Sequence, residues 1–302
     1  MDLGIKKNRS TIKKNILSEK YIIIEKIGSG SFGEVFVAEE RLNKKKIAAK
    51  VESNKKSSRI ENEYKIYKYL ENKGFEKGLP KVYNLYKTEN YNIMFMQLLG
   101  PSLDDKFTEN KKKFKISTVL LLAIELISLL EKLHKSNYIH RDIKANNFLI
   151  GMTDPEQIYI MDFGLSKKYM NWGRHIDLKV DRSLIGTARY ASINMHMGLE
   201  PSRRDELESI GYMLIYFIKG ILPWQGIKKV NGKSHIKMIG EMKMSISVEK
   251  LCENLPECFC KYLKYCKNLK FDEEPDYEYM KNIFLETAER YKIKLIYEWI
   301  AQ

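Results

Sequence analysis

In the first part of the chain, short apolar runs rich in β-branched and aromatic residues stand between polar turns, a pattern typical of β-strands. Four such runs, separated by glycine-rich or lysine-rich turns, cover residues 21–24, 34–38, 46–51 and 92–96. One stretch follows a different period: Ile60, Tyr64, Tyr67 and Leu70 recur at helical spacing and predict a helix over 59–71. The pattern predicts a small β-rich lobe over residues 21–97 with one main helix.

Beyond Leu99 the pattern becomes helical. Residues 118–134 predict a long amphipathic helix, and helical stretches recur near 203–219, 236–244, 256–267 and 276–289. The change predicts a larger, mostly helical lobe over residues 98–302. The expected fold class is therefore α+β with two lobes, preceded by a lysine-rich N-terminal extension over residues 1–20.

The composition is that of a folded and strongly basic protein. Lysine and arginine total 53 against 39 aspartates and glutamates, which gives a net charge of +14, and 44% of the residues are hydrophobic. The longest apolar stretch, residues 119–130, contains Glu125 and is too short to span a bilayer, so no membrane span is expected. The charge alone leaves nucleic acid, an anionic membrane and an acidic or phosphorylated protein open as partners.

The four cysteines predict reduced thiols rather than a metal site. Cys252, Cys258, Cys260 and Cys266 follow one another at spacings of 6, 2 and 6 with no histidine among them, which does not match a zinc pattern. A reducing compartment inside the cell, cytoplasmic or nuclear, is therefore expected.

A glycine-rich run is the first candidate for chemistry. Gly28, Gly30 and Gly33 would let the backbone approach a phosphate closely and direct N–H groups at it. Residues 34–38 continue as a strand, so the run predicts a hairpin over a nucleotide rather than the strand–turn–helix of a dinucleotide-binding fold. Taken alone the motif is weak, and an ordinary glycine-rich turn is the alternative.

A lysine among apolar strand residues supports the nucleotide interpretation. Lys50 follows Ala48 and Ala49, and a buried ammonium is costly unless it is paired. Glu63 on the following helix is the candidate partner. Such a pair would hold Lys50 against the α- and β-phosphates of a nucleotide.

The most informative run begins with His-Arg-Asp142. Lys144 and Asn147 follow at once, and Asp162-Phe-Gly comes twenty residues after Asp142. The segment from Asn147 to Met161 reads as a two-stranded hairpin, which would bring Asp142, Asn147 and Asp162 into one cleft. Phosphoryl transfer needs a carboxylate base, a cation near the γ-phosphate and ligands for Mg²⁺, and these residue types supply all three.

These motifs resemble those of eukaryotic protein kinases, and from about residue 21 to residue 297 the chain is similar to the casein kinase 1 family. The marks of that family are Leu98-Leu-Gly-Pro-Ser-Leu103, His140-Arg-Asp-Ile-Lys144, Asp162-Phe-Gly-Leu-Ser-Lys-Lys-Tyr169, Gly186-Thr-Ala-Arg-Tyr-Ala-Ser-Ile-Asn194, Ser202-Arg-Arg-Asp-Glu-Leu-Glu-Ser-Ile-Gly-Tyr212 and Leu222-Pro-Trp-Gln-Gly226. The resemblance implies a bilobal kinase fold in a monomer. It also implies transfer of the γ-phosphoryl group of ATP, with Mg²⁺, to Ser or Thr of acidic or phospho-primed proteins.

The resemblance assigns roles to individual positions. Asp142 and Lys144 would be catalytic, and Asn147 and Asp162 would bind Mg²⁺. The ATP-binding set would be Ile27, Gly28, Ser29, Gly30, Ser31, Phe32, Gly33, Glu34, Val35, Ala48, Lys50, Glu63, Met96, Leu99 and Leu149. The substrate anion pocket would comprise Arg189, Gly226, Lys233 and His235, with a second basic cluster of Arg141, Lys167 and Arg182.

Several positions depart from the family pattern. Ala145 and Asn146 stand where the family has Pro-Asp, and Gln97 stands where a hinge glutamate is expected. His235 aligns with the lysine of the anion pocket, and the segment after Asp162 is about two residues shorter than in the family. These changes leave the phosphate-transfer residues in place and put the priming pocket in question.

Three other interpretations remain. A pseudokinase docking module would lack Lys50, Asp142 or Asp162, and all three are present. A vaccinia-related kinase would share the chemistry, whereas the run from Ser192 to Asn194 favours casein kinase 1. A nucleic-acid-binding protein is not expected because the chain carries no such motif. Residues 163–189 hold six basic and two acidic side chains, and residues 219–243 hold six and one, so the charge favours anionic protein substrates.

Overall fold

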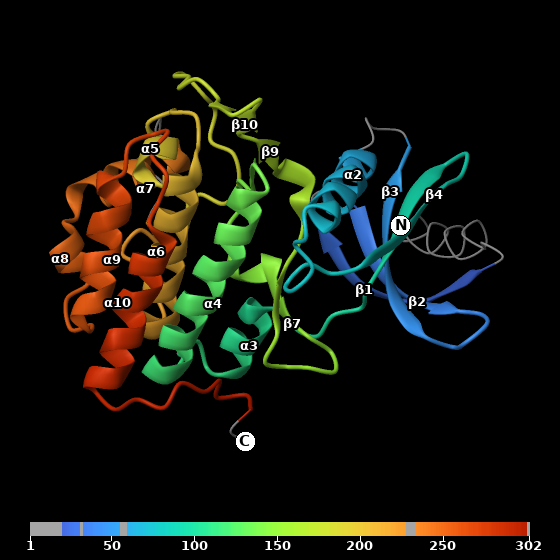
Figure 1. Cartoon of the computed structure of the whole chain (residues 1–302), viewed down its shortest axis with the longest axis horizontal. Coiled ribbons are helices and arrows are strands. Elements are labelled where there is room, and N and C mark those ends of the chain that lie inside the picture. The colour runs from blue at the N-terminus through green and yellow to red at the C-terminus, as the bar shows by residue number, and fades with distance from the viewer. Residues whose placement is uncertain (1–19, 31–32, 55–58, 228–233, 301–302) are drawn as a thin grey trace, which may run out of the picture. The chain divides into compact units, whose positions relative to one another are not determined.

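The computed structural model describes residues 20–30, 33–54, 59–227 and 234–300, so the expected N-terminal extension lies outside the described residues, apart from Lys20. The chain divides into two units (Figure 1). The N-terminal unit comprises Met1–Gly100 with Asp162–Gly164, and the C-terminal unit comprises Pro101–Met161 with Leu165–Gln302.

An antiparallel sheet forms the centre of the N-terminal unit. Its strands are β1 (Tyr21–Gly30), β2 (Gly33–Glu40), β3 (Lys46–Ser53), β4 (Val82–Lys87) and β5 (Tyr91–Met96), in the order β1-β2-β3-β5-β4. Every neighbouring pair is antiparallel, and the four strand-like runs expected from the sequence lie in β1, β2, β3 and β5.

The alternation of side chains along β3 determines which of them are available for chemistry. Side chains of a strand alternate between its two faces. Ile47, Ala49 and Val51 join the main hydrophobic cluster of this unit, so Ala48 and Lys50 point to the opposite face. Both faces of β3 are buried, and a charged side chain at position 50 therefore requires a partner.

Helix α2 (Arg59–Asn72) supplies that partner. It packs against β4 and β5, and its buried face consists of Ile60, Glu63, Ile66, Tyr67 and Leu70. The helical spacing predicted from the sequence is thus correct, and it places Glu63 among apolar residues one turn before Tyr67.

The C-terminal unit is mostly helical. Its helices are α3 (Leu103–Glu109), α4 (Ile116–Lys135), α5 (Ile193–His196), α6 (Arg203–Lys219), α7 (His235–Ser245), α8 (Val248–Leu251), α9 (Glu257–Asn268) and α10 (Tyr277–Arg290). Helix α4 packs on α6 and α10, and α6 packs on α9, so α6 is buried along almost its whole length (Figure 1). The expected α+β class is confirmed.

Short strands of the C-terminal unit carry the loops that matter for chemistry. They are β6 (Tyr138–Ile139), β7 (Phe148–Ile150), β8 (Ile158–Ile160), β9 (Lys167–Lys168), β10 (Met170–Asn171) and β11 (Arg174–His175). The single-turn helices η1 (Ala145–Asn147) and η2 (Phe163–Leu165) lie between them in the chain. Strands β7 and β8 pair as the hairpin expected between Asn147 and Met161.

Two expectations on composition meet the structure directly. The four cysteines are free thiols, and burial raises the pKa of Cys252 to about 12 and that of Cys258 to about 11. Within the described ranges, no helix combines the length and the apolar character that a membrane crossing requires.

Candidate active site

The glycine-rich run forms the end of the β1–β2 hairpin. Gly28 pairs with Val35, Ser29 with Glu34, and Gly30 with Gly33, while Ser31 and Phe32 at the tip lie outside the described residues. A Cβ atom at Gly33 would lie 2.3 Å from the Val51 carbonyl oxygen, so only glycine allows this approach to β3. Ile27 is exposed and Val35 is half-buried.

Lys50 forms the ion pair with Glu63 that the sequence predicts. Its Nζ donates to Glu63 Oε2 at 2.7 Å and Oε1 at 3.0 Å, and to Asp162 Oδ1 at 2.9 Å. Burial, which leaves the residue 8% exposed, would lower the pKa of Lys50, but the two carboxylates outweigh it and raise that pKa above its ordinary value. Lys50 is therefore a permanent cation held by two anions.

Tyr67 on α2 holds the segment that contains Asp162. The backbone N–H of Asp162 donates to the Tyr67 hydroxyl oxygen at 3.1 Å. The ring of Phe163 meets the ring of Tyr67 edge to face, with centroids 4.9 Å apart and planes at 88°. These contacts, together with the Lys50 pair, explain why Asp162–Gly164 belongs to the N-terminal unit although the chain around it does not.

The residues expected around adenine lie on β3, β5 and the segment after it. Ala48 and Met96 are directly paired across β3 and β5, and both are buried. Leu99 is also buried, whereas Gln97 uses its backbone and its side chain to bond Lys81. Leu149 belongs to the other unit, where it is half-buried in β7.

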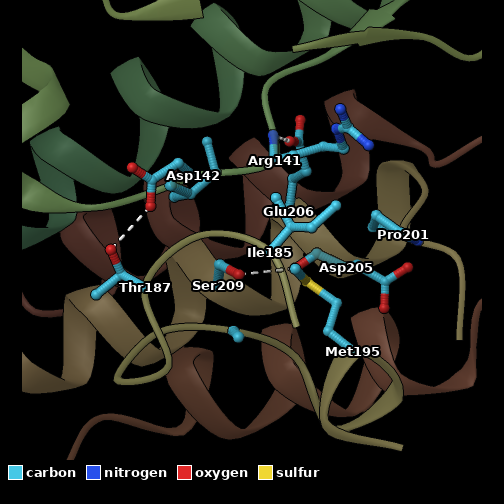
Figure 2. Close-up of a pocket in the computed structure, with 11 residues that line it drawn as sticks. Arg141, Asp142, Ile185, Thr187, Met195, Pro201, Asp205, Glu206 and Ser209 are labelled. Carbon is cyan, nitrogen blue, oxygen red and sulfur yellow. Dashed lines mark hydrogen bonds between the residues drawn. The ribbon is translucent and has the colours of Figure 1, made fainter. Parts of the chain in front are cut away.

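Asp142 is the centre of the second group, in the C-terminal unit. Lys144 Nζ donates to its Oδ2 at 2.5 Å. The Thr187 hydroxyl donates to its Oδ1 at 2.8 Å (Figure 2). Asn147 Nδ2 donates to the Asp142 carbonyl oxygen at 2.8 Å. The structure thus brings Asp142, Lys144 and Asn147 together, and Thr187 joins them.

The backbone before Asp142 is held from inside the unit. Arg141 has a φ of +68°, and its N–H donates to Glu206 Oε1 at 2.5 Å (Figure 2). Gly186, with a φ of +80°, approaches so closely that a Cβ there would lie 2.4 Å from the Arg141 carbonyl oxygen. The cavity that Arg141 and Glu206 line has a volume of about 10 Å³, room for a single water molecule and not for a substrate.

The second basic cluster surrounds an internal carboxylate. Lys167 Nζ lies 2.6 Å from Glu200 Oε1, and Arg182 Nε lies 3.1 Å from Glu200 Oε2. Glu200 is only 1% exposed, and although burial works against it, Lys167, Arg182 and Arg141 lower the pKa of its carboxyl. Arg141 itself donates through Nε to the Leu165 carbonyl oxygen at 2.6 Å. The single negative charge of Glu200 offsets one of the three positive charges of Arg141, Lys167 and Arg182.

Arg189 has no such internal anion. Its half-buried side chain lies over the rings of Tyr190 and Tyr216, with Cζ 5.7 Å and 5.3 Å from their centroids. Among the described residues it forms no ion pair with a carboxylate. Gly226, with a φ of +72°, and His235 are exposed, and Lys233 lies outside the described residues.

Sequence reasoning gave no role to Thr187, Glu200 or Glu206. Each stands in a motif quoted for the family or beside one. Spacing along the chain alone does not show that Thr187 bonds Asp142, that Glu200 bonds Lys167 or that Glu206 bonds the Arg141 backbone. A signal was available for Glu206, which lies in the helix after residue 202. In a buried helix, an Asp or Glu side chain requires a bonding partner.

A comparison with known families identifies the chain. The family model described as "Protein kinase domain" matches residues 21–287, most of the chain. The matched range contains both groups of side chains, one with a glycine-rich hairpin and a paired lysine, the other with a bonded aspartate. It implies ATP as phosphoryl donor and proteins as substrates. The chain belongs to the protein kinase family.

Proposed function

We propose that the protein is a casein kinase 1-like kinase that transfers the γ-phosphoryl group of ATP to Ser or Thr of acidic or phospho-primed proteins. The observation that carries the proposal is the surroundings of Asp142. One carboxylate oxygen is bonded by Lys144 and the other by Thr187, so the group has a fixed direction and an adjacent cation. A fixed carboxylate next to a lysine suits a base that accepts a hydroxyl proton during phosphoryl transfer.

The chemistry needs little more than position and charge. The hydroxyl oxygen of the substrate forms a bond to the γ-phosphorus as the bond to the bridging oxygen breaks, ADP leaves, and the hydroxyl proton passes to Asp142. Lys144, whose ammonium is half-buried, offsets the charge that spreads over the transferring group. Lys50 holds the α- and β-phosphates, with Glu63 fixing its ammonium.

Mg²⁺ fits the donor atoms of Asn147 and Asp162. Hard oxygen ligands suit this ion. Asn147 uses its amide nitrogen for the bond to Asp142, so its amide oxygen is the atom suited to the ion. The Asp162 carboxylate would be the second ligand, and bound Mg²⁺ would supply charge neutralisation for the phosphates.

The substrate preference is proposed to depend on Arg189. Lys167 and Arg182 share the carboxylate of Glu200, whereas Arg189 forms no ion pair among the described residues and presents a planar guanidinium suited to phosphate or carboxylate. The wider segments 163–189 and 219–243, with their excess of basic side chains, would attract anionic substrates at a distance. We propose action as a monomer, in the cytoplasm or nucleus, to which the free thiols are suited.

The test uses the purified full chain, radiolabelled ATP and casein. The Asp142→Asn variant is expected to lose about 10²- to 10⁴-fold in kcat and to retain ATP binding. Asp154→Asn, in the exposed turn of the β7–β8 hairpin, is the matched control and is expected to keep wild-type turnover. Wild-type turnover in Asp142→Asn would overturn the assigned base. Inactivity of the wild-type chain on every acceptor would instead favour a pseudokinase.

Peptides test the finer specificity. Ser, Thr and Tyr acceptors are compared in primed (pSer-x-x-Ser), acidic and unprimed contexts. Phosphorylation of Ser and Thr only, with the primed or acidic peptides preferred, is expected. Equal rates in all three contexts would overturn the anion preference while leaving the kinase assignment intact.

A further inference from the structure

The C-terminal unit buries a second lysine, far along the chain from the catalytic loop and with no role in the mechanism above. Lys243 on α7 is 2% exposed. No carboxylate in the described part of the chain lies within ion-pair distance of its Nζ. Its ammonium lies instead over two aromatic rings, 4.8 Å from the centroid of Tyr212 and 4.9 Å from that of Trp224.

The hydrogen bonds of this lysine go to one backbone segment. Nζ donates to the Ala188 carbonyl oxygen at 3.0 Å and to the Ala191 carbonyl oxygen at 2.5 Å. These two carbonyls flank Arg189 and Tyr190. A lysine ammonium is the one side-chain group that carries three donors on a single rotatable atom, so it can bond two carbonyls and still face a ring.

Neighbouring side chains hold the same segment. Trp224 Nε1 donates to the Arg189 carbonyl oxygen at 2.8 Å, and its ring meets that of Tyr212 edge to face at 4.9 Å. His196 Nε2 lies 3.2 Å from the Ala188 carbonyl oxygen. The segment 188–191 is thus bonded through three carbonyls, and Lys243 accounts for two of them.

We propose that Lys243 is a positioning residue for substrate specificity: it fixes segment 188–191 so that the Arg189 guanidinium points in one direction toward an acidic or phosphorylated group of the substrate. The inference rests on the proposed anion preference of Arg189. A bidentate contact between guanidinium and phosphate depends on orientation, so freedom in the backbone of Arg189 weakens recognition before it affects phosphoryl transfer. Burying a cation without a carboxylate is costly, and such costs are typical of functional sites.

The experiment compares kcat and KM of the full chain on primed, acidic and unprimed peptides. Lys243→Met keeps the length of the apolar stem and removes the donors. It is expected to raise KM for the primed and acidic peptides by about 10-fold, the loss of one hydrogen bond involving a charged group. KM for ATP and kcat are expected to stay within about twofold, because neither depends on Arg189. Lys261→Met, exposed on α9, is the matched control.

A double-mutant cycle with Arg189→Ala isolates the coupling. If Lys243 acts through Arg189, then Lys243→Met adds nothing to the KM defect of Arg189→Ala. Additive defects, or a loss of kcat on the unprimed peptide equal to that on the primed one, would show a merely structural role and overturn the inference. Trp224→Phe keeps an aromatic ring but loses the indole N–H that bonds the Arg189 carbonyl, so it should raise KM for the primed and acidic peptides by about threefold. This variant tests the proposal even if Lys243→Met does not fold.

The two proposals fail in different ways. If the wild type prefers anionic peptides and Arg189→Ala loses that preference while Lys243→Met and Trp224→Phe keep it, the role of Lys243 is wrong and the proposed function stands. If the wild type phosphorylates all three peptides equally, the anion preference is wrong and the inference falls with it.

Discussion

Lys50 and Lys243 are both buried lysines, one in each unit, and their surroundings differ in kind. Lys50 is bonded by the carboxylates of Glu63 and Asp162, which raise its pKa above the ordinary value. Lys243 is bonded by two carbonyls between two rings, and burial lowers its pKa to about 7 against a weaker opposing effect of Glu208. Two buried lysines therefore have pKa values shifted in opposite directions, because their partners differ.

The difference suggests two uses of one side chain. A lysine that stays charged at any accessible pH is suited to hold phosphates. Its carboxylate partners fix the position of its ammonium group, which still attracts the phosphates of a bound nucleotide. A lysine that bonds backbone carbonyls is suited to hold a segment in place, and its charge is secondary to its donors. Substitution at each position should therefore affect different quantities, the first the transfer of phosphate and the second the choice of substrate.

Replacement of Lys50 is expected to have the largest effect. Lys50→Arg keeps the charge, but a planar guanidinium cannot occupy the place of a compact ammonium between two carboxylates. We expect kcat/KM for ATP to fall by about 10²- to 10³-fold, the usual loss when one electrostatic contact to the reacting group is misplaced. Steady-state kinetics on casein at varied ATP measures it. Lys46→Arg, exposed on the same strand, should behave as wild type, and so should Lys243→Arg with respect to ATP.

The outcome that would contradict the comparison is equally definite. If Lys50→Arg kept its turnover, the position of the ammonium would not matter, and the carboxylate cage around Lys50 would be a feature of stability only. If instead Lys243→Arg lost kcat/KM for ATP, the division of roles between the two lysines would be wrong.

Replacement of Glu63 sharpens the role of the carboxylates. Glu63→Gln removes one anion from a buried pair and leaves the Lys50 ammonium with Asp162 alone. Breaking a buried pair in this way costs about 3–5 kcal/mol of unfolding free energy. Urea unfolding followed by circular dichroism provides the measurement. The control is Glu61→Gln on the same helix, whose partner Lys87 is exposed, and its cost should be at most about 1 kcal/mol. Equal costs for the two variants would mean that the Lys50 charge does not depend on Glu63.

The Lys50–Glu63 pair could be predicted from the sequence because a strand lysine among alanines demands a partner and the next helix offers one. Four of the five strands followed from runs rich in β-forming residues, but β4 did not. It pairs at the edge of the sheet with a register shift between Val82 and Asn84, and half its positions are exposed. Helix α3 was also missed, although the capping box of Ser102 and Asp105 was a usable signal.

Lys243 shows where sequence reasoning ends. The helix around it was predicted, but a lysine on an amphipathic helix reads as a solvent-exposed charge. Its burial depends on Tyr212 and Trp224, which come from distant parts of the chain, and its partners are backbone carbonyls, which have no sequence signature. The same holds for Glu200, whose burial among Lys167 and Arg182 is a property of the folded segment and not of spacing.

The smallest expected effect concerns the pH dependence of stability. The pKa of Lys243 is about 7 in the fold against an ordinary 10.5, so between these values the unfolded chain binds a proton that the native protein does not. The contribution of Lys243 to stability is therefore lowest below about pH 7 and rises with pH, by at most about 1.4 kcal/mol per unit. Lys50, whose pKa is raised, should contribute a constant amount over the same range.

Urea unfolding of the wild type and of Lys243→Met, at several pH values from about 6 to 9, tests whether the contribution of Lys243 to stability rises with pH. The unfolding free energy of the wild type relative to the variant should be flat at the acid end and increase toward the alkaline end. Besides Glu208, Lys243 faces two titratable groups, Tyr212 and His196. Burial raises the pKa of Tyr212 well above its ordinary value, and burial, as the larger cause, lowers that of His196 to about 4, so neither group interferes between pH 6 and 9. If the difference in unfolding free energy between the wild type and Lys243→Met did not change with pH, the rings and carbonyls would hold the proton of Lys243 as firmly as two carboxylates hold that of Lys50. The two lysines would then differ in position alone.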